Sequence, residues 1–412
     1  MKIKDLVVLV ILMIIGEVVF VLPFVIIRIF RPTFLTVFDI SNLELGTAFS
    51  VYGVVAMVAY FAGGPVADRF KPKQLIPTAL LATAAGGLLL YTIPSVGTLA
   101  VLYGFWGAST ILLFWSAFVK SQRQLGRHTG QGKSFGLVDA GRGLVAALMA
   151  TSSVYLLDWL LPTDAAVAAP ADFKHALQQI ILIFSLLTAV CGLLAWLVLG
   201  NEQSATGNHL NLKGIRQVMS KRTIWQQAII VLCAYVGYKC TDDFSLYARD
   251  TLQYDDVDAA HLAAITFWAR PAAAIISGLL ADKWITSKVV MVCFVITMIG
   301  SLVISTGVWG VGTEVFVIIT ATSTSSAIYG LRGIYYALFE ESGLPMKVTG
   351  SAAGLVSVVG YTPDVFMGPL MGVILDNNPG PLGHQYLFGL LAAFSLVGLI
   401  ASVAFHKSTP EA

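Results

Sequence analysis

Ionisable side chains stand inside several long apolar runs of this sequence, where each is costly unless it has a partner or a function. Glu17, Arg142 and Arg270 lie near the middle of their runs, and no opposite charge lies within a helical turn of Glu17 or Arg270. Arginine keeps its charge and presents a planar fork that suits carboxylate, sulfonate or phosphate groups. A carboxyl group away from water can take up and release a proton. The sequence therefore predicts an anion held by Arg142 and Arg270, with Glu17 as a proton-coupling residue.

Further charged and aromatic residues in the runs extend this candidate site. The additional solute-binding candidates are Lys239, Arg332, Tyr336 and Tyr361, and the additional proton-coupling candidates are Asp364 and Asp139. Some of these charged residues could instead serve only to neutralise a neighbouring charge. Asp139 precedes Arg142 by three residues, and Lys239 precedes two acidic residues by three and four, so such pairs can neutralise each other on one helix face. Arg332 could likewise bind backbone carbonyls or Glu340.

The other reactive residue types form no pattern that is typical of an enzyme. All four cysteines lie in apolar runs, and the six histidines lie mainly at loops or at the ends of runs. The sequence has no nucleotide-binding loop, nucleophile motif or metal-ligand spacing. The net charge of +2 gives no general attraction to nucleic acid. We therefore expect no enzymatic activity, no cofactor, no metal and no nucleic-acid partner.

The apolar runs that must position these residues predict a protein that crosses the lipid bilayer many times. Hydrophobic residues make up 57% of the 412 residues and charged residues 12%, which is about half the charged fraction of a soluble domain. Runs of this length must be helices, because backbone groups at membrane depth have to be satisfied within their own segment. We place twelve spans at about 5–28, 44–67, 73–93, 97–119, 134–160, 174–200, 224–248, 259–281, 287–308, 313–338, 347–375 and 385–406.

Lysine and arginine residues outside the spans indicate the orientation of the chain. With the N-terminus inside, nearly all of them lie in cytoplasmic segments, and the exceptions are Arg28, Arg31, Lys174 and Arg249. Cytoplasmic loops carry such an excess of positive residues. We expect a multi-pass protein of a bacterial inner membrane with both termini cytoplasmic.

A long polar cytoplasmic connection divides the spans into two sets of six. It follows the sixth span and is rich in Asn, Gln, Lys and Arg. Two halves of similar length suggest a duplication. We therefore expect a six-helix bundle at residues 1–200, a cytoplasmic linker at 201–223 and a second six-helix bundle at 224–412.

One short pattern recurs at the same place in both halves. Residues 64–69 end the second span and residues 278–283 end the eighth, and both read Gly-x-x-Ala-Asp followed by a basic residue. The glycine permits close approach of helices, the acid can bond to a neighbouring helix N-terminus, and the base stays on the cytoplasmic side. The residues of this candidate gating motif are Gly64, Asp68, Arg69, Gly278, Asp282 and Lys283.

With this motif the chain resembles the major facilitator superfamily over essentially its whole length. Gly64, Asp68 and Arg69 fit the loop motif of that family between helices two and three, whereas Lys71 and Pro72 depart from it. The resemblance implies an all-α membrane fold of twelve transmembrane helices, in two six-helix bundles related by pseudo-twofold symmetry. It also implies alternating access to a central cavity, with the motif as a latch of the outward-open state.

Taken together, these features predict a secondary active transporter that couples protons to symport of a small organic anion. A sugar acid, another carboxylate, a sulfonate or a phosphate ester would fit the arginines. A multidrug/proton antiporter is the first alternative, although the Gly-Pro motif typical of its fifth helix is absent here and Arg142 suits a cationic drug poorly. A receptor that keeps the fold without transport is the second. We expect a monomer whose partners are the solute and a proton or other coupling ion.

Overall fold

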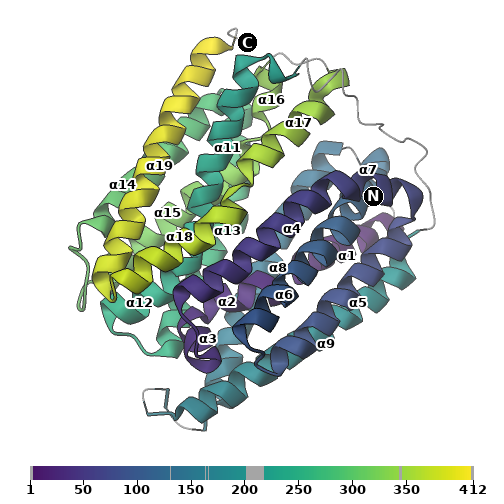
Figure 1. The fold of residues 1–412 in the computed structure, drawn as a ribbon. Coiled ribbons are helices and arrows are strands. Elements are labelled where there is room, and N and C mark those ends of the chain that lie inside the picture. Colours follow the sequence, from purple (N-terminus) through teal and green to yellow (C-terminus); the bar gives the residue numbers. More distant parts are fainter. Residues whose placement is uncertain are drawn as a thin grey trace.

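The chain forms two helical bundles that lie side by side in a computed structural model (Figure 1). The structure describes residues 3–129, 131–162, 164–165, 167–200, 218–342 and 346–409. Most of the expected cytoplasmic linker, residues 201–217, lies outside this part. The boundaries of that linker therefore stay a prediction.

The first bundle contains the helices that precede the linker. These are α1 (Ile3–Val18), the π-helix η1 (Val21–Val25), α2 (Ile26–Ile29), α3 (Arg31–Phe38), α4 (Asn42–Arg69), α5 (Pro72–Tyr91), α6 (Val96–Gly107), the π-helix η2 (Ala108–Trp115), α7 (Ser116–Thr129), α8 (Gln131–Leu160) and α9 (Pro170–Val198). Its buried side chains form one continuous apolar cluster, which also takes in residues at the start of α13 in the second bundle.

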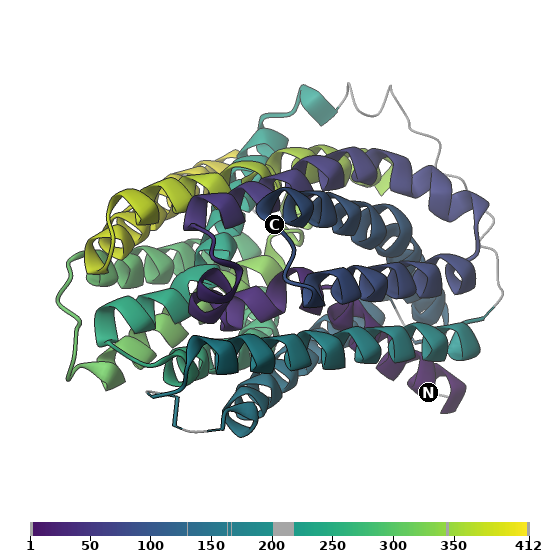
Figure 2. The ribbon, with the colours of Figure 1, turned by 60° about the horizontal axis from the view of Figure 1, so that its bottom comes forward.

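The second bundle contains the helices that follow the linker, and its interior is divided between two larger apolar clusters. These helices are α11 (Arg222–Cys240), the 3-10 helix η3 (Thr241–Asp243), α12 (Phe244–Leu252), α13 (Asp256–Lys283), α14 (Thr286–Ser305), α15 (Glu314–Ile334), α16 (Leu338–Glu341), α17 (Met346–Gly360), α18 (Pro363–Asn377) and α19 (Pro381–Ser408). Figure 2 shows the same separation of the two bundles after a turn about the horizontal axis.

Within the described residues, eleven helical stretches are long and apolar enough to cross a membrane. The twelfth expected span, at 224–248, is helical at the expected place but is not among the stretches that are long and apolar enough to cross a membrane. It consists of α11, η3 and α12, and it carries Lys239, Asp242 and Asp243 at its middle. Charges at the 3-10 turn therefore make this segment the most unusual of the twelve expected spans.

Arg28 lies inside the protein, which corrects its expected place in an outer segment. Helix α2 extends the first span to Ile29, and the Arg28 side chain is only 3% exposed. The next two residues, Ile29 and Phe30, are apolar and also buried, so the buried stretch continues beyond Arg28. With Arg28 removed from the outer segments, the expected excess of positive charge on the other side becomes larger.

The two bundles meet most closely at one face. We call this face the opposite face, and it contains the starts of α4, α13 and α19, at Asn42, Asp256 and Pro381. The ends of the same three helices lie at the other face, which we call the terminal face. At the opposite face, Thr33 Oγ1 donates to Asp256 Oδ2 over 2.6 Å. The Asp376 carboxylate accepts hydrogen bonds from the backbone N–H groups of Asn42 and Leu43 at 3.1 and 2.8 Å. One bundle thus caps a helix of the other, which closes this face.

Helices α4 and α18 pack backbone to backbone along this closed interface. A Cβ atom built on Gly46 would lie 2.1 Å from the Gly368 carbonyl oxygen, and one built on Gly368 would lie 2.5 Å from the Gly46 carbonyl oxygen. Glycines at such positions allow helices to approach closely in lipid. The contact therefore needs glycine on both sides.

We predict that Gly46→Leu opens the opposite face. A side chain at this position clashes with backbone of the other bundle, at a cost of about 1–3 kcal/mol. Spin labels on Val167→Cys and Val311→Cys, which replace valines that are 75% and 71% exposed, would report a longer distance between the bundles. Gly97→Leu is the control, since a Cβ there meets no atom within 4 Å. Equal distances in the two variants would contradict the prediction.

Candidate functional site

A cavity of about 90 Å³ lies between the two bundles and is lined by both of them. It is surrounded by Glu17, Phe20, Phe24, Val25, Arg28, Tyr52, Tyr60, Ile111, Trp115, Arg142, Tyr235, Tyr238, Lys239, Arg270, Arg332, Tyr361 and Asp364. Segments η1 and η2 contribute to this wall, and π-helical turns are common at functional sites. Five cations but only two carboxylates line the cavity, so its wall carries an excess of positive charge.

The first charged group in the cavity is centred on Glu17. Arg270 of the second bundle donates to it from both terminal nitrogens, from Nη1 to Oε1 at 2.7 Å and from Nη2 to Oε2 at 3.1 Å. Arg142 of the first bundle lies 3.4 Å from the same carboxylate and also donates from Nε to the Gly16 carbonyl oxygen at 3.0 Å. The structure thus brings the three predicted residues together. The two arginines hold an acid of the protein itself in this conformation.

Asp139 stands apart from this group. Its carboxylate lies 3.4 Å from Arg142, its side chain is 50% exposed, and it is not among the cavity-lining residues. This contact is the local neutralisation that the three-residue spacing suggested.

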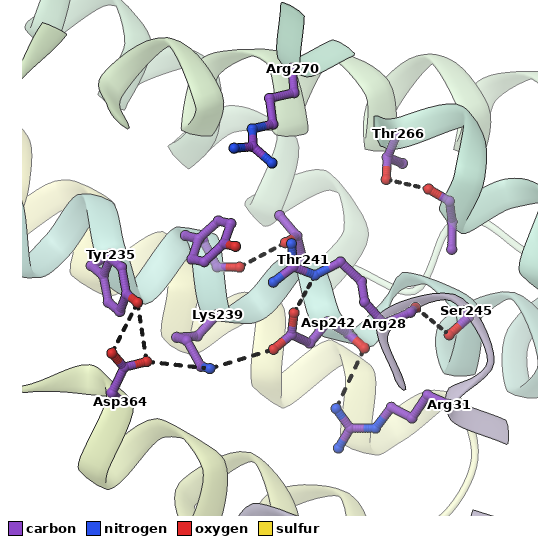
Figure 3. A network of polar contacts seen from close by, with 12 residues as sticks. Arg28, Arg31, Tyr235, Lys239, Thr241, Asp242, Ser245, Thr266, Arg270 and Asp364 are labelled. Atoms are coloured by element: carbon purple, nitrogen blue, oxygen red, sulfur yellow. Dashed lines mark hydrogen bonds and ion pairs between the residues drawn. The ribbon is translucent and has the colours of Figure 1, made fainter. Parts of the chain in front are cut away.

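The second charged group is centred on Lys239 and reaches the first bundle through the pair of Asp242 with Arg28 (Figure 3). Lys239 Nζ lies 3.5 Å from Asp364 Oδ1 and 3.7 Å from Asp242 Oδ2, so one ammonium is shared by two carboxylates. Asp242 also pairs with Arg28 of the first bundle. The Tyr235 hydroxyl donates to the Asp364 carboxylate, and its oxygen lies 3.0 and 3.1 Å from the two carboxylate oxygens, which share the single hydrogen. Asp242 therefore has two cationic partners, and Asp364 has one.

Arg332 differs from the other cations of the cavity. Its guanidinium carbon lies 3.6 Å from the centre of the Tyr238 ring, and Arg28 lies over the same ring at 4.4 Å. In the part of the chain that the structure describes, no carboxylate forms an ion pair with Arg332. Glu340, the partner suggested from the sequence, is exposed beyond the end of α15. A cation–π contact stabilises the guanidinium but leaves its charge unneutralised.

The two tyrosines of the candidate site lie in one hydroxyl network but occupy different positions. Tyr361 lines the cavity, where its ring stacks on Tyr60 of the first bundle with centroids 6.0 Å apart. Tyr336 donates to the Tyr361 hydroxyl at 2.9 Å and lies 2.8 Å from Ser357 Oγ, but it does not line the cavity. Tyr336 is therefore placed to orient Tyr361.

The candidate gating motif lies at the terminal face, as its position at the ends of two spans suggested. Helix α4 ends at Arg69 and α13 ends at Lys283, with Asp282 beside it and exposed. The side chain of Asp68 falls outside the described part of the structure. A Cβ on Gly64 or Gly278 would meet no atom within 4 Å. The expectation that these glycines serve close helix approach is therefore wrong for this conformation, because the tight contacts between bundles lie at the opposite face.

Sequence reasoning missed Arg28 and the contacts across the opposite face. The signal for Arg28 was the apolar pair Ile29 and Phe30, which shows that the buried run continues beyond it. The pairing of Asp376 with the start of α4 has no local signal, since 333 residues separate the carboxylate from Leu43.

Known proteins resemble this chain over most of its length. The Major Facilitator Superfamily model matches residues 13–366. Two inner membrane proteins of Escherichia coli are similar: YqcE is 26% identical over 382 residues, 89% of this chain and 87% of its own, and YihN is 25% identical over 380 residues, 90% and 88%.

Solved structures share the arrangement of helices. The nucleoside transporter NupG superposes with a TM-score of 0.74 at 13% identity, covering 99% of this chain and 100% of its own. FucP in the outward conformation gives 0.65 at 17% identity, covering 98% and 99%. At these identities the likeness concerns the fold alone.

We predict that Glu17→Gln destabilises the protein far more than Asp139→Asn. The first change leaves Arg270 without its bidentate partner in a buried site, where loss of one partner costs about 3–5 kcal/mol. The second removes a half-exposed contact worth about 0–1 kcal/mol. Thermal unfolding in detergent compares the two variants, which both lose a carboxylate next to Arg142. Similar losses of stability would show that the Glu17 pair is not a principal contact between the bundles.

Proposed function

Because the chain belongs to the Major Facilitator Superfamily, and is thus a secondary transporter of a small solute and not an enzyme, we propose that it carries a small organic anion together with a proton. The family match confirms the resemblance and the fold class that the sequence predicted. The solute class and the coupling ion are our proposal, and the contacts of the cavity support it.

The observation that carries the proposal is the unneutralised charge of Arg332. The other four cations of the cavity wall each lie within ion-pair distance of a carboxylate of the protein. Arg332 has the Tyr238 ring instead. A guanidinium donates charge-assisted and often bidentate hydrogen bonds to a carboxylate, sulfonate or phosphate, and these are stronger than hydrogen bonds between neutral groups. We assign the first contact with the solute to Arg332.

The remaining wall fits the body of a small polar solute. Tyr52, Tyr60, Tyr235, Tyr238 and Tyr361 all line the cavity. Such side chains combine an apolar ring with a hydroxyl group. A sugar acid, another small carboxylate, a sulfonate or a phosphate ester offers a charged end for Arg332 and carbon or hydroxyl groups for these rings.

We assign the proton to Asp364, with Glu17 as the second candidate. Among the described residues, Asp364 forms an ion pair with Lys239 alone and shares it with Asp242, so protonation of Asp364 leaves Lys239 with a partner. Protonation of Glu17 would instead remove the negative charge that both Arg142 and Arg270 pair with. An anion that binds near Lys239 could compensate for the change on Asp364.

For location, we propose a bacterial inner membrane with the terminal face in the cytoplasm. Both E. coli relatives are described as inner membrane proteins, and the excess of lysine and arginine lies at the terminal face. The closed opposite face would then be the outer one, and the conformation would be inward-facing. We propose a monomer, since both walls of the cavity come from one chain.

A multidrug/proton antiporter is less well supported. A cationic drug would meet five cations and two carboxylates in this cavity, and like charges at short range oppose binding. A receptor without transport has no specific observation in its favour.

We predict that small organic anions raise the unfolding temperature of the purified protein. Gluconate, a hexose phosphate and isethionate are the probes, with glucose and a nucleoside as uncharged comparisons. A ligand at about 100 times its Kd stabilises the folded state by about 2.7 kcal/mol. The shift should disappear in Arg332→Gln and persist in Arg222→Gln, which removes an exposed arginine at the start of α11. Equal shifts in both variants would remove Arg332 from the binding site.

We also predict that Asp364→Asn separates binding from proton movement. In proteoliposomes with an enclosed pH dye, the anion that binds should acidify the lumen of vesicles carrying the unmodified protein. Asp364→Asn should bind the same anion but move no protons, because its amide does not titrate. Asp158→Asn, an exposed residue of α8, is the control. Normal proton movement by Asp364→Asn would assign coupling to another residue.

A further inference from the structure

A fully buried histidine near the opposite face takes no part in the cavity. His384, in the first turn of α19, has a side-chain exposure of 0%. Its Nδ1 lies 2.6 Å from Asp243 Oδ2 of η3, and its Nε2 lies 3.1 Å from Asp250 Oδ2 of α12. All three residues belong to the second bundle.

The geometry of this triad requires an additional proton. A neutral imidazole has a single N–H group. Here both ring nitrogens face carboxylate oxygens at hydrogen-bond distance, so each contact needs a hydrogen between its two atoms. The triad must therefore hold one proton more than a neutral histidine and two ionised carboxylates. That proton lies either on the ring or on one of the two acids.

The surroundings of the triad supply a route for this proton. The edge of the Tyr247 ring lies against the imidazole with centroids 5.5 Å apart, and Cys240 of α11 lies near Asp243. Asp243 is fully buried, whereas the Asp250 side chain is 29% exposed. Arg249, beside Asp250 in sequence, pairs with Asp256. Water at the opposite face therefore reaches the triad through Asp250.

The triad is directly connected to the contact that closes the opposite face. Asp243 follows Asp242, and Asp242 pairs with Arg28 of the first bundle. Two residues further on, Ser245 Oγ donates to the Arg28 carbonyl oxygen at 3.1 Å. The position of the turn η3 therefore decides whether Arg28 is held.

Loss of the proton would disturb this turn. One of the two ring contacts would lack a hydrogen. The Asp243 carboxylate would then keep its buried charge with fewer hydrogen bonds to stabilise it, since its Oδ1 already has no hydrogen-bond partner among the described residues. A buried carboxylate without a partner is strongly unfavourable. Movement of η3 toward water relieves this and pulls Asp242 away from Arg28.

We infer that His384, Asp243 and Asp250 form a proton-binding site that holds the opposite face closed while the proton is bound. The site is separate from Asp364 and from the solute. It rests on the proposed function only in that the protein alternates between two facings. A proton that enters from the opposite face would favour closure of that face, which is the direction that proton-coupled uptake requires.

The test is the distance between spin labels on Val167→Cys and Val311→Cys as pH is raised from about 6 to about 10.5, a range that extends above the ordinary titration of histidine because two carboxylates stabilise the bound proton. No solute is added, so failure of the anion proposal would not affect the result. The closed population should fall with rising pH, and the ratio of open to closed molecules should rise by up to about tenfold per pH unit, the limit for one linked proton.

Two variants of the triad and one control make the test specific. His384→Gln should remove the pH dependence, because glutamine does not titrate. Asp250→Asn should keep a pH-dependent distance with its transition at lower pH, because one carboxylate that stabilises the protonated ring is gone. His175→Gln, an exposed histidine in α9 of the first bundle, should behave like the unmodified chain. A distance that does not change with pH in the unmodified chain, or the same pH dependence in both triad variants as in that chain, would overturn the inference.

Discussion

Ion pairing inside the membrane is the constraint on which the rest of this structure depends. A charge in a medium of low polarity is tolerated only when a partner lies close. Arg270 binds Glu17, Arg28 binds Asp242, and Lys239 is shared by two carboxylates. Arg332 alone among the cavity cations has an aromatic ring in place of an acid. The cavity therefore carries positive charge that no ion pair among the described residues neutralises, and we propose that a solute anion does so.

Two of these pairs, Glu17–Arg270 and Arg28–Asp242, also join the two bundles, and we propose that they link binding to the change of facing. Glu17 and Arg28 belong to the first bundle, whereas Arg270 and Asp242 belong to the second. Opening of the opposite face must separate Arg28 from Asp242, and a large rotation would strain the Glu17–Arg270 contact. Each of these steps would leave a buried charge without its partner. We propose that a proton or a solute anion then takes the place of the lost partner, so that neutralisation and the change of facing are coupled.

Much of the fold could be predicted from the sequence, because hydropathy and the repeated Gly-x-x-Ala-Asp-basic pattern act locally. The central depth of Glu17, Arg142 and Arg270 follows from counting along each run. Which charge pairs with which does not follow, since Glu17 and Arg270 are 253 residues apart and meet only through packing of the two bundles. Gly64 has no close neighbour in this structure, and a single sequence does not reveal which conformation a structure shows.

The most direct test of this account is the position of the charged group of a bound anion in an experimental structure of the complex. We expect that group within hydrogen-bond distance of the Arg332 guanidinium, with Arg270 still bound to Glu17. An anion held by Arg270 in place of Glu17, with Arg332 left on the Tyr238 ring, would contradict it.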